Sequence, residues 1–348
     1  MKRSQTHPAF RRRAVTLAAA ALLTTTLAAC GSSSDDTPEV GDSWDDIVAK
    51  AADEGTVSLY SAQAPQTVER IADCFRKEYP DISIDVVRGT SGDLLTRVDQ
   101  ERASGSDGAD VWVTTELAWF KSRSEEDALL EPRGPAKESW PSEYLDGPTV
   151  IGGVEPLVIS YNTDLVKNAP TGYDDLVSSD FKGKLGTSEL AATVISAWYQ
   201  WLEDNQSGFL KDLAAKKPGL YVGSVPISQA VASGEIAAST YGIPTAVQPL
   251  IDEGAPIKYV VPEPSFGVSY GIGALGWAKQ PNGALVLLDF LMSPVGQQCW
   301  HGSGESASPL PDIKGALDIK SMEPWKYSDF SEDDERKLTD TWNKLFRG

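Results

Sequence analysis

Residues 56–87, TVSLYSAQAPQTVERIADCFRKEYPDISIDVV, decide the fold class of this 348-residue chain. The stretch begins with an apolar segment typical of a β-strand, Thr56–Tyr60, and ends with a second one, Ile82–Val87. Between them, five apolar residues from Val68 to Tyr79 recur at helical spacing, and Pro80 ends the pattern. The stretch therefore predicts a strand, a helix and a second, parallel strand.

The same alternation continues toward the C-terminus. Gly89–Gly92 precedes a helix with apolar residues on one face, and Ala109–Val113 is typical of a third strand. In parallel sheets of this kind, ligands bind beyond the carboxyl ends of the strands. We therefore expect ligand contacts in the loops that follow the three strands, at residues 61–65, 89–92 and 114–116.

A second alternating unit runs from about Lys184 to Pro262. It includes a helix with an apolar face from Ala191 to Leu202, which Thr187 or Ser188 would cap. Further strands are predicted at residues 156–161, 220–222, 236–241, 257–261 and 271–278. Two α/β units joined by connecting strands predict two lobes with a cleft between them.

The N-terminus carries a predicted lipoprotein signal peptide over residues 1–29. Three arginines precede an uncharged apolar run that ends in the sequence LAACG at residues 27–31, and this run is too short to span a bilayer. Export by the general or the twin-arginine route would remove the leader and leave Cys30 as the acylated, membrane-anchoring residue. Polar residues 30–43 predict a flexible tether, and the predicted location is the outer face of the cytoplasmic membrane.

Net charge limits the classes of binding partner, and the cysteine count indicates one possible disulfide. Five of the 31 basic residues and none of the 50 acidic ones lie in the leader, so the mature chain has a formal net charge of −24. This charge disfavours nucleic acid and anionic lipid as partners, so membrane contact is expected only through the lipid anchor. Cys74 and Cys299 also remain in an oxidising compartment, where they form either a disulfide or two unrelated buried thiols.

Two groups of segments resemble bacterial extracytoplasmic solute-binding proteins. Residues 279–297, KQPNGALVLLDFLMSPVGQ, are similar to one segment of these proteins. Residues 160–163, 174–176 and 181–185 are similar to a second segment. The resemblance is to the ferric-ion, phosphonate and polyamine group of ABC importer lipoproteins. It implies an α/β, two-lobed fold of the periplasmic-binding-protein type II, with lobe one at residues 44–155 plus 264–348 and lobe two at 156–263. It also implies a monomer that passes a small solute to the transmembrane permease subunits.

The residues at the predicted loops favour an anionic ligand that bears a carboxylate or a phosphonate. Helix N-termini present free N–H groups and a partial positive charge, and the segments 89–92 and 186–188 are suitable cradles. The residues expected to bind ligand are Ser61, Gln63, Thr90, Ser91, Gly92, Thr115, Glu116, Thr187, Ser188, Ser224, Tyr241, Ser269 and Tyr270.

Cationic ligands are the alternative. A polyamine could pair with Glu116 and Trp119, or with Glu155 and Glu263 near the expected connecting strands.

Ferric ion is a further alternative with a difficulty. Ferric-ion members of the group place two adjacent tyrosines where this chain has Pro244 and Thr245, and Tyr241 stands alone nearby. Iron would therefore need a different ligand scheme, and we expect neither a resident metal nor a cofactor.

Enzymatic activity is disfavoured by the inventory of reactive residues. His7 leaves with the leader, so His301 is the one histidine of the mature chain, and no nucleophile elbow, phosphate loop or zinc-protease motif is present. A secreted hydrolase that uses carboxylates alone is the remaining alternative from another functional class.

Overall fold

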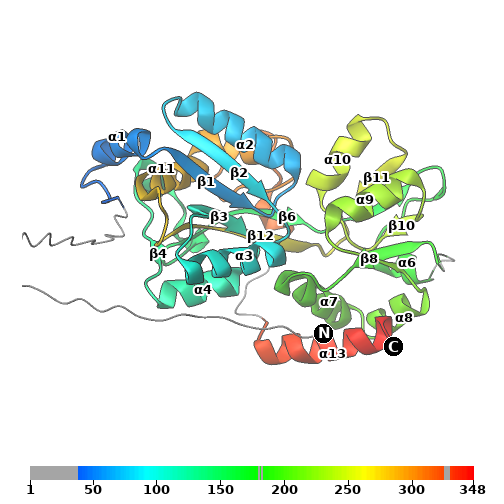
Figure 1. Cartoon of the computed structure of the whole chain (residues 1–348). Helices are drawn as coiled ribbons and strands as arrows, with labels where there is room; N and C mark the ends of the chain where they lie inside the picture. The colour runs from blue at the N-terminus through cyan, green and yellow to red at the C-terminus, as the bar shows by residue number, and fades with distance from the viewer. Residues whose placement is uncertain (1–37, 179–180, 182, 325–329) are drawn as a thin grey trace, which may run out of the picture. The chain divides into compact units, whose positions relative to one another are not determined.

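The computed structural model describes residues 38–178, 181, 183–324 and 330–348. The predicted signal peptide, Cys30 and most of the predicted tether lie outside the described residues. Within them, two separate sheets are each flanked by helices (Figure 1). This arrangement confirms the predicted two-lobed α/β class. We call the first sheet with its helices lobe one and the second sheet with its helices lobe two.

Lobe one contains the β-α-β-α-β unit predicted from residues 56–113. Strand β1 pairs in parallel with β2 and β3, and β12 runs antiparallel between β3 and β6. The strands are β1 Thr56–Ser61, β2 Ser83–Arg88, β3 Val111–Thr114, β4 Leu129–Leu130, β5 Leu145–Asp146, β6 Thr149–Pro156, β12 Phe266–Leu275 and β13 Glu323–Pro324. The helices are α1 Trp44–Glu54, α2 Pro65–Glu78, α3 Ser91–Ser104, α4 Leu117–Glu125, α5 Pro135–Ser139, α11 Pro281–Met292 and α12 Pro294–His301, with 3₁₀ turns at Ser142–Tyr144 and Ile319–Ser321.

Lobe two is built on a five-stranded sheet in the order β11-β7-β10-β8-β9. Its strands are β7 Ile159–Asn162, β8 Leu185–Ser188, β9 Gly219–Tyr221, β10 Ala238–Ser239 and β11 Ile257–Val260. The helices around it are α6 Tyr173–Ser178, α7 Thr193–Asn205, α8 Phe209–Ala215, α9 Ser224–Ser233, α10 Pro244–Asp252 and α13 Glu332–Phe346. The core follows the predicted apolar faces: α7 buries Val194, Ile195, Trp198 and Leu202.

The chain crosses from one sheet to the other between β6 and β7 and returns between β11 and β12. The sequence predicts one continuous strand at residues 156–161, but the structure divides it. The Leu157 N–H donates to the Phe266 carbonyl at 2.9 Å, and the Val158 N–H donates to the Gly242 carbonyl at 2.9 Å. The backbone therefore passes from the first sheet to the second lobe between these two residues. The sequence did not predict this break, because an apolar run alone does not show where a strand changes partners.

The C-terminal helix α13 packs on α7 and α8 of lobe two (Figure 1). Its Trp342 is fully buried, with its ring 6.1 Å from that of Tyr199. Its last residues add an ion pair between Arg347 and Glu189. The expectation placed residues 264–348 in lobe one, whereas this last helix lies against the other lobe, where its apolar face is covered.

A disulfide joins helices α2 and α12 in lobe one. Cys74 and Cys299 are 225 residues apart in sequence, and their Cα atoms are 6.5 Å apart. On the same face, the guanidinium of Arg70 donates to the carbonyl of Cys299 and to the carboxylate of Glu305. The bridge therefore ties the second helix of the fold to a segment near the end of lobe one.

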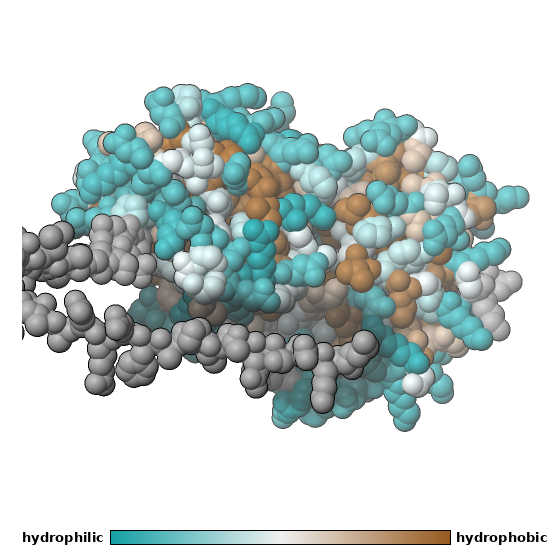
Figure 2. All heavy atoms as spheres, viewed as in Figure 1, coloured by the Kyte–Doolittle hydropathy of each residue, from teal (hydrophilic) through white to brown (hydrophobic). Residues whose placement is uncertain are grey.

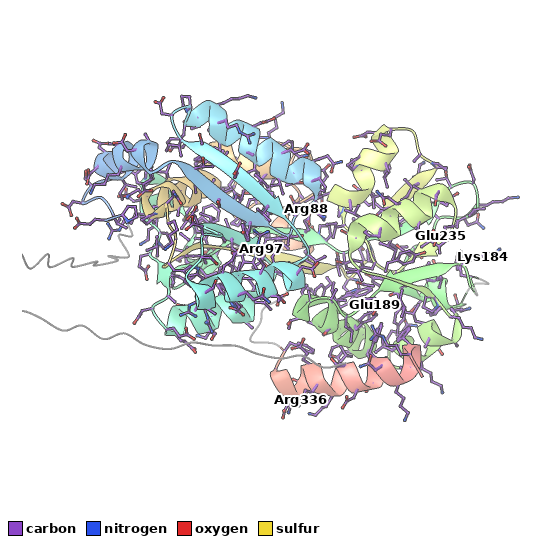
Figure 3. The ribbon with its side chains drawn as sticks, in the orientation of Figure 1. Arg88, Arg97, Lys184, Glu189, Glu235 and Arg336 are labelled. Atoms are coloured by element: carbon purple, nitrogen blue, oxygen red, sulfur yellow. A yellow bond between two sulfur atoms is a disulfide. The ribbon has the colours of Figure 1, made fainter. Side chains whose placement is uncertain are left out.

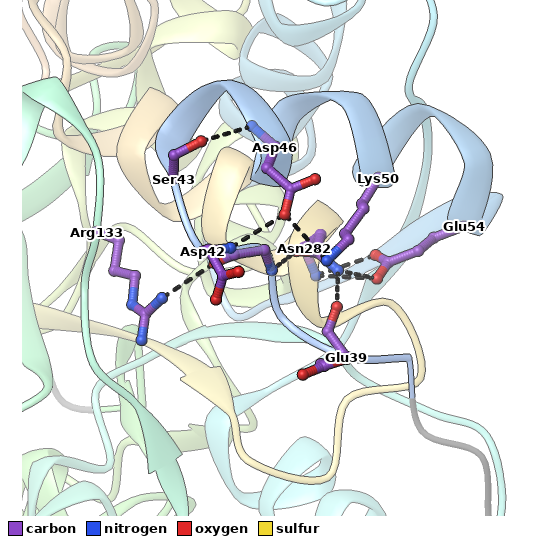
Figure 4. A network of polar contacts seen from close by, with 9 residues as sticks. Glu39, Asp42, Ser43, Asp46, Lys50, Glu54, Arg133 and Asn282 are labelled. Carbon is purple, nitrogen blue, oxygen red and sulfur yellow. Dashed lines mark hydrogen bonds and ion pairs between the residues drawn. The ribbon is translucent and has the colours of Figure 1, made fainter.

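The start of the folded part is held by a polar network (Figure 4). The Gly41 N–H donates to the Asn282 side chain at 2.8 Å, and the same amide donates to the Glu39 carbonyl at 3.1 Å. The Glu54 carboxylate accepts from the backbone N–H groups of Asn282 and Gly283 at the start of α11. A carboxylate at a helix N-terminus is favourable. The last part of the expected tether is thus bound to lobe one rather than free.

None of the helices in the described part of the chain has the length and apolar character needed to cross a bilayer. The face in Figure 2 is mostly hydrophilic, as expected for a chain with this excess of acidic residues.

Candidate ligand-binding cleft

A cleft lies where the loops after β1, β2 and β3 of lobe one face the starts of helices in lobe two. It contains about 610 Å³ of empty space, part of it open to solvent. The cleft is lined by Ala62, Arg88, Thr90, Ser91, Thr115, Ser188, Ala191, Ala192, Val194, Ile195, Gly223, Ser224, Tyr241, Ile243, Val268 and Tyr270.

Seven of the thirteen residues expected to bind ligand are on this lining, namely Thr90, Ser91, Thr115, Ser188, Ser224, Tyr241 and Tyr270. The other six are not on it: Ser61, Gln63, Gly92, Glu116, Thr187 and Ser269. The structure therefore brings hydroxyl groups from both lobes to one cleft, and it directs several of the remaining polar groups into the protein.

Buried hydrogen bonds account for three of these six residues. The Thr187 hydroxyl lies 2.6 Å from the Tyr199 hydroxyl and 2.7 Å from that of Thr240, in a network behind the cleft. The hydroxyl of Ser61 bonds to the side chain of Gln63 at 3.4 Å, and both residues are buried. These side chains support the wall of the cleft and do not reach its surface.

Gly92 is a point of close approach between the two lobes. A Cβ atom at this position would lie 2.7 Å from the Ala191 carbonyl oxygen, closer than real Cβ contacts allow. Gly92 is in the first turn of α3, and Ala191 comes just before α7. The glycine therefore lets two helix N-termini from different lobes meet at the edge of the cleft.

Four helices begin at the cleft. Helix α3 comes from lobe one, and α7, α9 and α10 come from lobe two. Thr90 caps α3 by accepting from the Asp93 N–H at 3.2 Å. The residues just before the other three helices, Ala192, Gly223 and Ile243, make no side-chain cap bond. Glu116 accepts from the backbone N–H of Thr193 at the start of α7, and α10 begins with Pro244, which has no N–H group. The helix starts add partial positive charge at the cleft.

The predicted cap of the lobe-two helix is wrong. Thr187 and Ser188 belong to strand β8, and helix α7 begins five residues after the end of that strand, at Thr193. The Ser188 hydroxyl instead donates to the Glu189 carbonyl at 2.9 Å. The connecting residues Leu190–Ala192 offer no side-chain acceptor, so no residue of this connection caps the helix.

Arg88 is a charged residue of the cleft lining that the sequence reasoning missed. It is the exposed last residue of β2 (labelled in Figure 3), and it lines both the cleft and a second hollow beside α2. Its Nε donates to the Gln63 carbonyl at 2.9 Å, which holds the base of the guanidinium and leaves its outer N–H groups available. Its position in the sequence could have indicated it, because Arg88 directly precedes the Gly-Thr-Ser-Gly loop expected to contact ligand.

Glu116 spans from lobe one to the start of α7. It is 5% exposed, and burial raises its pKa to about 7, with a further increase from the charge of Glu335 on α13. The hydroxyl and backbone N–H of Thr193 act in the opposite direction and lower this pKa. The carboxylate is therefore committed to the N-terminus of a helix.

Glu155 lies beneath the cleft, between strands and a helix of both lobes. It is 2% exposed, and it accepts from the Thr245 hydroxyl at 2.6 Å and from the Tyr270 hydroxyl at 2.9 Å. Burial raises its pKa to about 7. Glu263, the other acid considered for a cation, is exposed and lines a different cavity. Neither residue presents a carboxylate to the cleft.

No cluster of three or more metal-binding side chains of the His, Cys, Asp or Glu type occurs among the described residues. Pro244 and Thr245, the residues compared above with the tyrosine pair of ferric-ion members, begin α10, and Thr245 is bonded to Glu155. His301 is fully buried, with its ring nitrogens near the Ser306 hydroxyl and the Gly152 carbonyl.

Solved structures with the same fold include three bacterial proteins. The substrate-binding protein of an ABC transporter from Agrobacterium tumefaciens has a TM-score of 0.76 at 16% identity, covering 86% of this chain and 97% of its own. AfuA from Actinobacillus pleuropneumoniae, with fructose-6-phosphate bound, has a TM-score of 0.66 at 20% identity, covering 84% and 99%. Iron-bound HitA from Pseudomonas aeruginosa has a TM-score of 0.64 at 18% identity, covering 84% and 98%. At these identities the likeness concerns the fold.

Comparison with curated proteins finds no match. A family model described as "Bacterial extracellular solute-binding protein" matches residues 57–304, which include the second sheet, the first sheet apart from Thr56 and β13, and the whole cleft lining. The two-lobed fold, the cleft between the lobes and this match agree, and the chain belongs to the family of bacterial extracellular solute-binding proteins.

Proposed function

We propose that the protein is the solute-binding component of an ABC importer and that its ligand is a small anion bearing a carboxylate or a phosphonate. Family membership implies an extracytoplasmic solute-binding role. The observation that carries the choice of an anion is the convergence of four helix N-termini and Arg88 on one cleft.

The balance of charge in the cleft supports this choice. Arg88 is the one charged residue among the residues that line it in the described part of the chain. Glu116 and Glu155, which a polyamine would need, are both buried and bonded to other protein groups. Guanidinium groups and helix N-termini bind carboxylates and phosphonates by charge-assisted hydrogen bonds.

The mechanism we propose is closure of the two lobes around the anion. Arg88 and the start of α3 belong to lobe one, whereas the starts of α7, α9 and α10 belong to lobe two. A ligand that contacts both sets stabilises the closed arrangement over the open one. The crossings between β6 and β7 and between β11 and β12 are the hinge segments. The loaded protein, anchored as a monomer through Cys30, then delivers its solute to the permease.

A thermal-shift screen of carboxylates, phosphonates, polyamines and Fe³⁺ tests the proposal. A ligand at 100 times its Kd adds roughly 2.7 kcal/mol to the stability of the folded state. Stabilisation confined to polyamines or Fe³⁺ would contradict an anion site, and chemical turnover of any compound would favour the hydrolase alternative.

A matched pair of variants then tests whether the anion binds at Arg88. Arg88→Gln removes the guanidinium of the cleft, and Arg97→Gln removes an exposed one that is paired with Glu101 on α3, outside the lining. We expect Arg88→Gln to weaken anion binding roughly 10- to 100-fold, as for loss of a charge-assisted hydrogen bond, and Arg97→Gln to leave it unchanged. Equal effects of the two substitutions would show that Arg88 does not contact the ligand.

A further inference from the structure

Tyr241 and Tyr270 form one wall of the cleft above the buried Glu155. On the basis of the proposed function, we propose that Glu155 is a positioning residue which, by taking the hydroxyl proton of Tyr270, makes the cleft select an anion that also carries a hydroxyl group.

The first step is the assignment of protons. A tyrosine hydroxyl has one proton and two acceptor lone pairs, and an ionised carboxylate can only accept. The Tyr270 hydroxyl therefore donates to Glu155 Oε2, and the Thr245 hydroxyl donates to Oε1. Both carboxylate oxygens are satisfied without a proton of their own, and the oxygen of Tyr270 is left with accepting capacity alone.

The second step concerns the charge state of Tyr270. Burial and the charge of Glu155 raise its pKa well above the ordinary value, so it stays a neutral phenol. The guanidinium of Arg88 is near enough to act on the same hydroxyl in the opposite sense. The phenol thus lies between the cation that attracts the anionic group and a buried negative charge. An anionic oxygen finds no proton at Tyr270 and is repelled by Glu155, whereas a ligand hydroxyl can donate to it.

The third step concerns Tyr241. Its ring packs on Trp198 with a centroid separation of 5.5 Å, and the residue lies on the cleft lining with Tyr270. This second phenol can donate to the same ligand hydroxyl. Together the two phenols offer one acceptor and one donor, which suits an alcohol. A ligand without the alcohol leaves the buried oxygen of Tyr270 unpaired, and sites built to bond a hydroxyl reject analogues that lack it.

Matched ligands that differ by one hydroxyl test this selection. The probes are lactate against propionate and 2-hydroxyethylphosphonate against ethylphosphonate, with Kd measured by calorimetry at pH 8.5. We expect the wild-type protein to prefer the hydroxylated member of a bound pair roughly 2- to 12-fold, as for one neutral hydrogen bond. In Glu155→Gln the new amide can donate to Tyr270, so the phenol proton turns toward the cleft, where it can also be donated to an anionic oxygen, and the preference should fall below that of the wild type.

The pH profile separates positioning from a purely structural role. Below pH 6 a protonated Glu155 can itself donate to Tyr270, so the wild-type preference should fall, whereas that of Glu155→Gln should stay constant. The charged and titratable groups that act on Glu155 are Arg70, Glu305, Tyr241 and Tyr270. Glu116 also titrates near neutrality. It is present in both proteins, so the comparison removes its contribution.

Tyr270→Phe keeps the inference testable if Glu155→Gln does not fold. Removal of the phenol oxygen should abolish the hydroxyl preference. Equal Kd values within each pair for the wild-type protein, or an unchanged preference in Tyr270→Phe, would overturn the inference while leaving the anion site intact. Failure of every carboxylate and phosphonate to bind would instead overturn the proposed function, and the inference with it.

Discussion

His301 gives the sharpest test of how the buried polar groups affect stability. It lies at the end of α12, stacked on Trp300 with ring centroids 4.8 Å apart. Burial lowers its pKa to about 3, and the charge of Arg70 contributes in the same direction against the Gly152 carbonyl. In the unfolded chain the imidazole has its ordinary pKa of 6.5. The folded protein therefore excludes a proton that the unfolded chain accepts.

The sign and size of the effect follow from this difference. Between pH 6.5 and pH 3 the unfolded chain binds one proton more at this site, so stability falls as the pH falls. Each pH unit within the window is worth roughly 1.4 kcal/mol. Two units, from pH 6.5 to pH 4.5, should remove about 3 kcal/mol of the stability that the neutral His301 contributes. Replacement with glutamine removes this dependence because glutamine does not titrate.

Urea unfolding of the wild type and His301→Gln at pH 7.5, 6.5, 5.5 and 4.5 measures the effect. The variant should be less stable at pH 7.5, and the gap should narrow by about 3 kcal/mol at pH 4.5. Gln297→Met is the control, since Gln297 is also buried on α12 and donates to the same Gly152 carbonyl at 3.1 Å. Its loss should cost the same at every pH. A gap for His301→Gln that stays constant over the four pH values would refute the reasoning.

Three further predictions concern the covalent features and the motion. Purified mature protein should show no reactive thiol without reductant, and Cys74→Ala/Cys299→Ala should lose about 2–5 kcal/mol of stability by urea unfolding; two reactive sulfhydryls would exclude the bridge. Cys30→Ala should leave the protein unprocessed or released by cell fractionation, and unaltered membrane anchoring would remove the lipid anchor from the proposal. Saturating ligand should lower the radius of gyration by small-angle scattering, and an unchanged radius would contradict closure.

Lobe one was predictable because its signals are local. The helix at residues 65–78 buries the apolar positions that recur at helical spacing, and the flanking strands at 56–61 and 83–88 coincide with the apolar runs. The strand break at residues 157–158 was not predictable, because both sheets bury their strands on each side and an apolar run looks the same in either. The position of α13 was also not predictable, because the pattern of an amphipathic helix does not indicate which surface of the protein it packs on.

The cleft was half predictable for a related reason. Loops after parallel strands are local features, so Thr90, Ser91 and Thr115 could be expected at the site. Whether a given polar side chain points into the cleft or into the protein depends on partners that are distant in sequence. Thr187 bonds to Thr240, 53 residues away, and the Nε of Arg88 donates to the carbonyl of Gln63, 25 residues away. Such pairings leave no periodic signal.

The net charge of the chain is negative, whereas the charged residue that lines the cleft is a cation. Their effects on a ligand depend on their distance from it. Exposed charges beyond about 8 Å are screened at physiological ionic strength, whereas groups that line a cleft act on the ligand directly. Two acids beside the cleft, Glu116 and Glu155, are buried and bonded to Thr193, Thr245 and Tyr270. A third, Asp93, is exposed, and its carboxylate accepts from the hydroxyl of Thr90. Because Arg88 is the one charged residue on the lining of the described part of the chain, a strongly acidic protein can still have a cleft whose own charged group is a cation.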